Sequence, residues 1–249
     1  MSDVQFHSMA DGRRIAYRFT AGTGPTLVFL PGYMSDMDGG KATALFAEAQ
    51  EKGRACLLLD YSGCGQSDGD FADGTLSRWR EEVLALIAAR VTGPVLLIGS
   101  SMGGWLMLLV AEELRESAAN PLAGIIGIAP APDFTTWGYS EEQRTLMAQG
   151  QTVYEDNPYG PEPTPTHPGF FADGQDQVML GGPIALDAPV RLLHGRQDAD
   201  VPYEISVALA DALDTDDVQL TLVWDGDHRL SRDGDIALLK RTVASFYGP

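Results

Sequence analysis

A glycine-flanked serine interrupts the apolar stretch LIGSSMGGWLML. Gly99 and Gly103 lie two positions before and two positions after Ser101, which gives the spacing G-x-S-x-G. A strand that turns sharply into a helix leaves no room for a Cβ at these two positions and exposes the central side chain. Ser100 does not fit as the centre, because Ile98 precedes it by two. The pattern predicts that Ser101 is a nucleophile; the alternative is a purely structural glycine turn.

A serine nucleophile needs a base, and the chain has four histidines. Where this motif carries a catalytic triad, the acid and then the histidine follow the serine, which excludes His7. His167 lies in a proline-rich stretch, and His194 ends an apolar strand, where we expect a structural role. His228, in WDGDHRLS, follows the last apolar stretch and would lie over the carboxyl ends of the strands. We therefore predict His228 as the base.

The third member of such a constellation is a carboxylate that holds the imidazole in one tautomer. Asp198, in HGRQDADVP, directly follows the apolar strand PVRLLHG and would lie at its carboxyl end. Asp200 in the same loop and Asp133 after the preceding strand are the alternatives. We predict Asp198 as the acid.

Backbone N–H groups would have to stabilise the oxyanion that forms when a serine attacks a carbonyl. Met102 follows the serine and begins the predicted helix, whose positive end points at the same place. The second donor is expected after the strand TLVFLPG, where Gly32 allows close approach of the backbone. We predict an oxyanion hole formed by the N–H groups of Tyr33 and Met102.

Apolar strands alternate with helices along most of the chain, which predicts a parallel sheet covered on both faces. A hairpin at Asp11-Gly12 would join the first two strands. The predicted strands are 4–9, 13–20, 26–32, 54–63, 95–99, 122–130, 189–195 and 218–224, and the predicted helices are 41–52, 76–91, 104–116, 203–213 and 233–246. We expect an α/β fold in a single domain, residues 1–249.

The alternation breaks off after the sixth strand. Residues 131–188 contain many prolines, and Ser140 with Gln143 forms a predicted capping box for a short helix. So long an excursion is typical of a functional insertion, and its aromatic content argues against disorder. We expect a lid or cap inserted in the domain. Its aromatic residues are Phe134, Trp137, Tyr139, Tyr154, Tyr159, Phe170 and Phe171, of which Phe134, Trp137, Tyr154 and Phe170 are the candidates for substrate binding.

The composition excludes several classes of partner. The net charge of −18 repels phosphate backbones and anionic membranes, so we expect no nucleic-acid partner. We expect no membrane span, because no stretch reaches the roughly 20 apolar residues required. Two cysteines are too few for a disulfide framework, and the start of the chain does not read as a targeting signal, which predicts a cytoplasmic protein. We expect no metal and no organic cofactor, since no cysteine–histidine cluster has ligand spacing.

Five segments carry a resemblance to a known family: PGYMSDMDGGKA, LDYSGCGQSDG, GSSMGGWLML, RLLHGRQDADVP and DHRL. They resemble the α/β-hydrolase superfamily and, within it, the family of abhydrolase domain-containing protein ten. Members of that family are mitochondrial palmitoyl-protein thioesterases, also described as acyl-glucuronide esterases. The mitochondrial presequence has no counterpart here, which favours a bacterial cytoplasmic relative, and the lid differs most.

The resemblance implies the α/β-hydrolase fold and assigns the nucleophile, acid and histidine to Ser101, Asp198 and His228. It implies a serine hydrolase that cleaves carboxylic esters or thioesters of small molecules or acylated proteins through an acyl-enzyme on Ser101. The alternatives are other reactions on the same fold, by a carbon–carbon hydrolase, a perhydrolase or a peptidase. A catalytically inactive binding protein is a further alternative of a different class.

Overall fold

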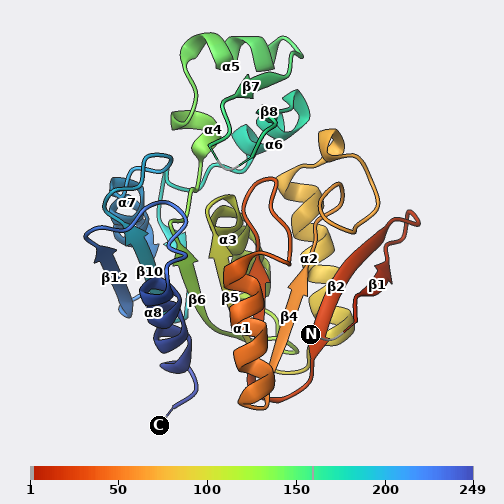
Figure 1. Ribbon diagram of the computed structural model, residues 1–249, viewed down its shortest axis with the longest axis vertical. Helices are drawn as coiled ribbons and strands as arrows, with labels where there is room; N and C mark the ends of the chain where they lie inside the picture. The colour runs from red at the N-terminus through yellow and green to blue at the C-terminus, as the bar shows by residue number, and fades with distance from the viewer. Residues whose placement is uncertain (1–2, 159, 249) are drawn as a thin grey trace.

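An eight-stranded sheet runs through the middle of the computed structural model, which describes residues 3–158 and 160–248 (Figure 1). The strand order is β1-β2-β4-β3-β5-β6-β10-β12. Only the pairs β1–β2 and β2–β4 are antiparallel, which confirms the predicted, mostly parallel sheet. The strands of this sheet are β1 (Gln5–Ser8), β2 (Arg14–Thr20), β3 (Thr23–Leu30), β4 (Arg54–Leu59), β5 (Val95–Ser100), β6 (Leu122–Ile128), β10 (Val190–Gly195) and β12 (Val218–Val223).

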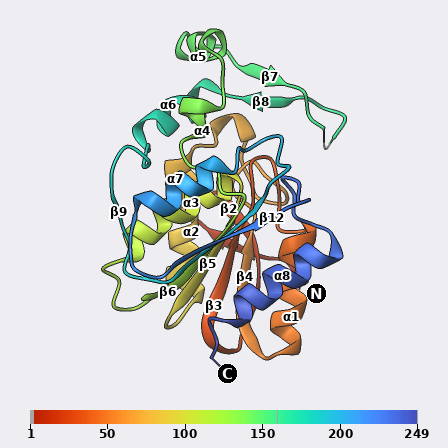
Figure 2. The same ribbon diagram turned by 90° about the vertical axis from the view of Figure 1, so that its left-hand side faces the viewer.

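Helices cover both faces of the sheet (Figures 1 and 2). One face carries α1 (Gly40–Glu51) and α8 (Asp233–Ala244), and the other carries α2 (Leu76–Arg90), α3 (Met102–Leu114) and α7 (Glu204–Ala212). Successive side chains of a strand point to opposite faces, so each strand contributes to two apolar layers. In β5, Val95 and Leu97 belong to the buried cluster under α2 and α3, and Leu96 and Ile98 belong to the cluster under α1 and α8.

Residues 134–176 of the segment between β6 and β10 lie above the carboxyl edge of the sheet, and the rest of the segment returns beside the sheet to the start of β10 (Figures 1 and 2). The predicted capping box is confirmed: the Ser140 hydroxyl accepts the Gln143 N–H, and the Gln143 side chain accepts the Ser140 N–H. Tyr159 lies outside the described residues. The elements of this segment are α4 (Phe134–Trp137), α5 (Glu141–Ala148), β7 (Val153–Glu155), β8 (Thr164–Thr166), α6 (Pro168–Asp176) and β9 (Ile184–Ala185).

Two short elements complete the chain, the 3₁₀ helix η1 (Phe71–Asp73) and the strand β11 (Leu213–Asp214), which pairs with β9. Within the described part of the chain, no helix combines the length and the hydropathy that crossing a bilayer requires.

The turn from β5 into α3 leaves no room for side chains at two glycines. A Cβ added to Gly99 would lie 2.3 Å from the Gly103 carbonyl oxygen. A Cβ on Gly103 would lie 2.2 Å from the carbonyl oxygen of Leu30, at the end of β3. Both positions therefore accept only glycine, because the helix begins in contact with the neighbouring strand.

Replacement of Gly103 by alanine should destabilise the fold, even though alanine favours a helix. The added methyl group meets backbone oxygens that cannot move aside, and overpacking of this kind costs about 1–3 kcal/mol. The matched control is Gly169→Ala in α6, where an added Cβ meets nothing within 4 Å. The control should be as stable as the wild type or up to about 1 kcal/mol more stable. Urea unfolding followed by circular dichroism measures both; a Gly103→Ala variant as stable as the control would contradict the packing described above.

Candidate active site

Ser101 lies in a strained backbone conformation at the turn between β5 and α3. Its φ of 55° and ψ of −122° are unusual for a residue that carries a side chain. Hydrogen bonds on both sides hold it there: its N–H donates to Ile128 over 2.9 Å, and its carbonyl oxygen accepts the N–H groups of Gly104 and Ala131. The hydroxyl is thereby raised above the carboxyl edge of the sheet.

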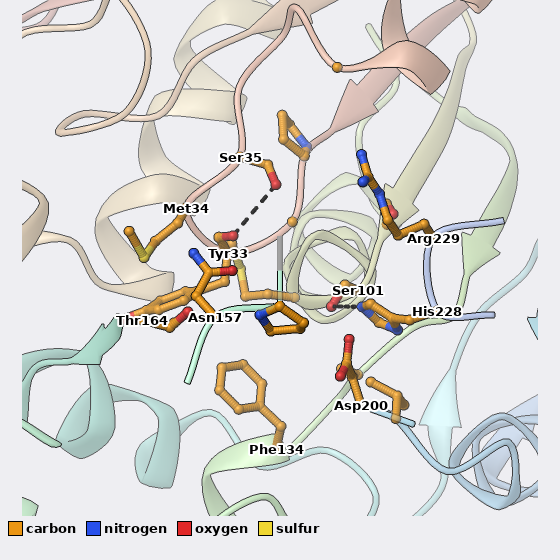
Figure 3. A pocket seen from close by; sticks show the side chains of 18 of the residues that line it. Tyr33, Met34, Ser35, Ser101, Phe134, Asn157, Thr164, Asp200, His228 and Arg229 are labelled. Carbon is orange, nitrogen blue, oxygen red and sulfur yellow. Dashed lines mark hydrogen bonds between the residues drawn. The ribbon is translucent and has the colours of Figure 1, made fainter. Parts of the chain in front are cut away.

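His228 reaches the serine from the loop between β12 and α8. Its Nε2 lies 3.1 Å from the Ser101 Oγ, and its side chain is 15% exposed (Figure 3). The side chain of Asp227 accepts the N–H of Leu230 over 3.0 Å and so closes this loop. The imidazole is held at hydrogen-bonding distance from the hydroxyl that sequence analysis selected.

Asp198 stands behind His228, in the loop after β10, with its side chain 0% exposed. One carboxylate oxygen, Oδ2, lies 2.8 Å from Nδ1 of His228. The other, Oδ1, accepts the N–H groups of Asp200 and Val201. Because an ionised carboxylate can only accept, Nδ1 of His228 carries the proton, and Nε2 is free to accept the hydroxyl proton of Ser101.

The carboxyl group of Asp198 is held in its ionised form. Burial alone would raise its pKa, but hydrogen bonds from His194 and His228, the charge of His228 and the N–H of Val201 hold the pKa below its ordinary value. A negative charge therefore stays behind the imidazole at every pH at which the protein would work.

The two alternative acids occupy other positions. Asp133 accepts the N–H groups of Met179 and Leu180 with its two oxygens, so it anchors the chain that follows α6. Asp200 lines the cavity in front of the imidazole. Ligand-type atoms of Asp200, Asp198 and His228 lie within 4.8 Å of one another, but the hydrogen bonds described above already engage Asp198 and His228.

In the part of the chain that the structure describes, none of the other three histidines forms a hydrogen bond with Ser101. His167 Nδ1 lies 3.1 Å from the Thr152 hydroxyl, and His7 is part of the hairpin strand β1. His194 is completely buried, and its Nε2 lies 3.2 Å from Oδ2 of Asp198. Sequence analysis assigned His194 a structural role and missed this contact; the four-residue spacing between His194 and Asp198 was the only signal for it.

The two predicted oxyanion donors lie next to the serine. Met102 is the first residue of α3, where N–H groups have no partner within the helix. The backbone at Gly32 passes so close that a Cβ there would lie 3.4 Å from the Cβ of Ser101. Tyr33 follows it, and Tyr33, Met102 and Ser101 line the same cavity. The oxyanion hole formed by Tyr33 and Met102 stays a prediction, and their place beside Ser101 is compatible with it.

A cavity of about 730 Å³ opens in front of Ser101. Apolar side chains from Met34, Phe134, Trp137 and Val201 line part of it, and polar ones from Ser35, Asn157 and Asp200 line the rest (Figure 3). In this view Met34 and Asn157 lie on one side of Ser101, His228 lies on the other, and Arg229 lies above His228.

The four aromatic candidates for substrate binding do not share one environment. Phe134 and Trp137 line the cavity. Phe170 is 1% exposed and packs behind the wall, with its ring 5.6 Å from that of Phe134. Tyr154 is 64% exposed, because alternate residues of β7 face opposite sides and Val153 takes the inward position. Tyr154 is therefore outside the cavity lining.

Two cationic side chains, Lys41 and Arg229, also line the cavity. The Lys41 ammonium donates to the backbone oxygen of Arg229 over 2.5 Å and so ties α1 to the loop that carries His228. Burial and the neighbouring charge of Arg229 lower the pKa of Lys41 to about 8. Sequence analysis missed Lys41. A lysine in the first turn of a helix interacts unfavourably with the helix dipole, so its presence there could have indicated a role other than helix stability.

The known proteins that resemble this chain in sequence and in structure are hydrolases. The pattern of the family described as "Alpha/beta hydrolase family" matches residues 27–247. The chain is 33% identical over 251 residues to human "Palmitoyl-protein thioesterase ABHD10, mitochondrial", an alignment that covers 97% of this chain and 79% of the relative. It superposes on a putative hydrolase from Agrobacterium vitis S4 with a TM-score of 0.92, at 37% identity, over 99% of this chain and 100% of that one. For mouse alpha/beta hydrolase domain-containing protein 10 the TM-score is 0.89, at 34% identity over 98% of both chains.

Reaction with a fluorophosphonate probe tests whether Ser101 is activated. We expect stoichiometric labelling of Ser101, because its hydroxyl donates to a neutral imidazole that can take the proton. His228→Ala should slow labelling by at least about 100-fold. Peptide mapping by mass spectrometry identifies the modified serine. Ser101→Ala should remain unlabelled and Ser100→Ala should label normally; the reverse result would place the nucleophile at Ser100.

Proposed function

Because the chain belongs to the alpha/beta hydrolase family, we propose that it is a serine hydrolase of carboxylic esters or thioesters. The observation that carries the proposal is the pair of hydrogen bonds that links Asp198, His228 and Ser101 at the base of a cavity. The relatives named as palmitoyl-protein thioesterases support the thioester as one substrate class.

In the proposed reaction Ser101 attacks the carbonyl carbon while Nε2 of His228 takes the hydroxyl proton. The N–H groups of Met102 and Tyr33 stabilise the oxyanion of the tetrahedral intermediate. His228 then gives its proton to the departing alcohol or thiol, which leaves an acyl group on Ser101. Water attacks the acyl-enzyme with the same histidine as base, and the carboxylic acid is released. The charge of Asp198 stabilises the imidazolium of His228 during both acylation and deacylation.

We propose that residues 131–188 act as a lid over this site. Their contribution of Phe134 and Trp137 to the cavity supports an apolar wall that binds the acyl group. The substrate is then an acylated small molecule or an acylated protein. Cys56 and Cys64 are both buried free thiols, which supports a reducing compartment such as the cytoplasm as the site of action.

The value of kcat/KM should rise as the pH is raised from acidic to neutral. Only the unprotonated base can accept the serine proton, so activity is lost as the pH falls. The pKa of Asp198 lies below its ordinary value, so protonation of its carboxylate should cause no second fall in kcat/KM on the acidic side of the profile. Initial rates with a neutral ester measure the profile. A rate that does not change between pH 5 and 8 would contradict histidine as the base.

Acyl-chain length tests the proposed substrate class. With p-nitrophenyl esters and with acyl thioesters, kcat/KM should rise with chain length until the cavity is full. Burial of a methylene contributes about 0.8 kcal/mol, which corresponds to at most about a fourfold gain per methylene. Ser101→Ala should lower kcat by about 10⁴-fold or more with every substrate. An active Ser101→Ala variant, or hydrolysis of none of these substrates, would contradict the proposal.

Two aromatic residues of the lid give a matched pair for this experiment. Phe134→Ala removes part of the cavity wall and should flatten the rise of kcat/KM with chain length, while acetyl esters react as before. Tyr154→Ala removes a ring that is 64% exposed and should leave the whole series unchanged. If the two variants behaved alike, the lid aromatics would not form the acyl wall.

A further inference from the structure

His194 is a buried imidazole that the proposed reaction does not use. It ends β10, four residues before Asp198, and is 0% exposed. Each ring nitrogen has a partner. Nδ1 lies 2.7 Å from the hydroxyl of Ser206 in α7, and Nε2 lies 3.0 Å from the carbonyl oxygen of Val201. Nε2 also lies 3.2 Å from Oδ2 of Asp198, the oxygen that contacts His228.

These partners define the tautomer of His194. The Val201 carbonyl can only accept, so Nε2 carries a proton, which points between that carbonyl and Oδ2 of Asp198. We assign Nδ1 as the acceptor of the Ser206 hydroxyl proton. In this arrangement the ring is uncharged, and Ser206, itself 0% exposed, prevents it from turning over. A buried imidazole with both nitrogens satisfied keeps a single orientation.

The carboxylate of Asp198 then receives four donors. Oδ1 accepts the N–H groups of Asp200 and Val201, both from its own loop. Oδ2 accepts His228 Nδ1 and His194 Nε2. Without His194, His228 would be the only side-chain donor to Oδ2 among the described residues, and the ring of His228 also has to exchange protons at Nε2 during the reaction. His194 supplies a donor that does not take part in that exchange.

We propose that His194 is a positioning residue, which holds the Asp198 carboxylate in the orientation that faces His228, and that Ser206 holds the ring of His194 in the orientation that presents Nε2 to Asp198. The inference rests on the proposed serine-hydrolase function. The polar partners of His194 are Ser206, Val201 and Asp198, so it acts on Ser101 through Asp198. Its effect should therefore appear in the chemical step rather than in substrate binding.

Three variants test the inference. His194→Leu removes the donor, and we expect kcat for a p-nitrophenyl ester to fall by about 10- to 100-fold, the loss typical when a partner of an active-site group is removed. KM should stay within about twofold, as for an interaction used only in the transition state. His194→Gln keeps an N–H at a similar reach and should recover most of kcat. His7→Leu, in β1, is the matched histidine control and should match the wild type.

A proton NMR spectrum gives a readout that does not depend on turnover. The proton shared by His228 and Asp198 should give a downfield signal in the wild type. That signal should shift or broaden in His194→Leu and return in His194→Gln. A change in packing alone would not distinguish the two variants in this way. Equal kcat and an unchanged signal in a folded His194→Leu protein would overturn the inference, as would a glutamine variant as impaired as the leucine variant.

Ser206→Ala decides the matter if His194→Leu does not fold. Removal of one hydroxyl leaves Nδ1 of His194 without its partner and frees the imidazole ring to turn, and kcat should fall by about three- to tenfold with unchanged KM, somewhat less than for loss of the donor itself. An unchanged kcat would overturn the inference. Fluorophosphonate labelling of the wild type separates the two proposals. If Ser101 is not labelled, the proposed function fails; if Ser101 is labelled and the His194 variants are unaffected, only the positioning role fails.

Discussion

The strained backbone of Ser101 is the constraint on which the site depends. A φ of 55° is tolerated because hydrogen bonds from β6 and from the first turn of α3 hold both sides of the residue. The same turn brings α3 against the end of β3, where only glycine fits at position 103. One tight junction therefore positions the hydroxyl, the first N–H groups of the helix and the loop after β3 together.

A second constraint is electrostatic. The chain carries a net charge of −18, yet the carboxylate of Asp198 has to stay ionised inside the protein. Four hydrogen-bond donors make this possible and keep its pKa below the ordinary value in spite of burial. Because donors contact both oxygens, the carboxylate group is held in one orientation. Its Oδ2 faces Nδ1 of His228, and this favours the tautomer of His228 that can accept a proton from Ser101.

The alternation of strands and helices, the hairpin and the glycine spacing around Ser101 could be read from the sequence because they depend on local periodicity and on close backbone contacts. The order of serine, acid and histidine further selected Asp198 and His228, which the fold brings within hydrogen-bonding distance of one another. Which aromatic residues of the segment 131–188 face the cavity could not be read, because the orientation of Tyr154 is set by the pairing of two short strands. The contact of His194 with Asp198 could not be predicted for a similar reason, because it depends on the conformation of the loop that follows β10.

Tyr33 connects the loop after β3 with the segment 131–188 above the sheet. Its backbone lies in the loop proposed to hold the oxyanion, whereas its ring packs edge-on against Phe71 and lies 4.8 Å from the ring of Phe170 in α6. Its hydroxyl donates to Pro165 in β8 over 3.1 Å. An acyl chain that displaces the segment above the sheet would therefore also move the residue whose N–H is the proposed oxyanion donor. The length of the acyl chain would then affect stabilisation of the transition state as well as substrate binding. The reason is that the backbone of Tyr33 is proposed to bind the oxyanion, while its ring packs against the segment above the sheet.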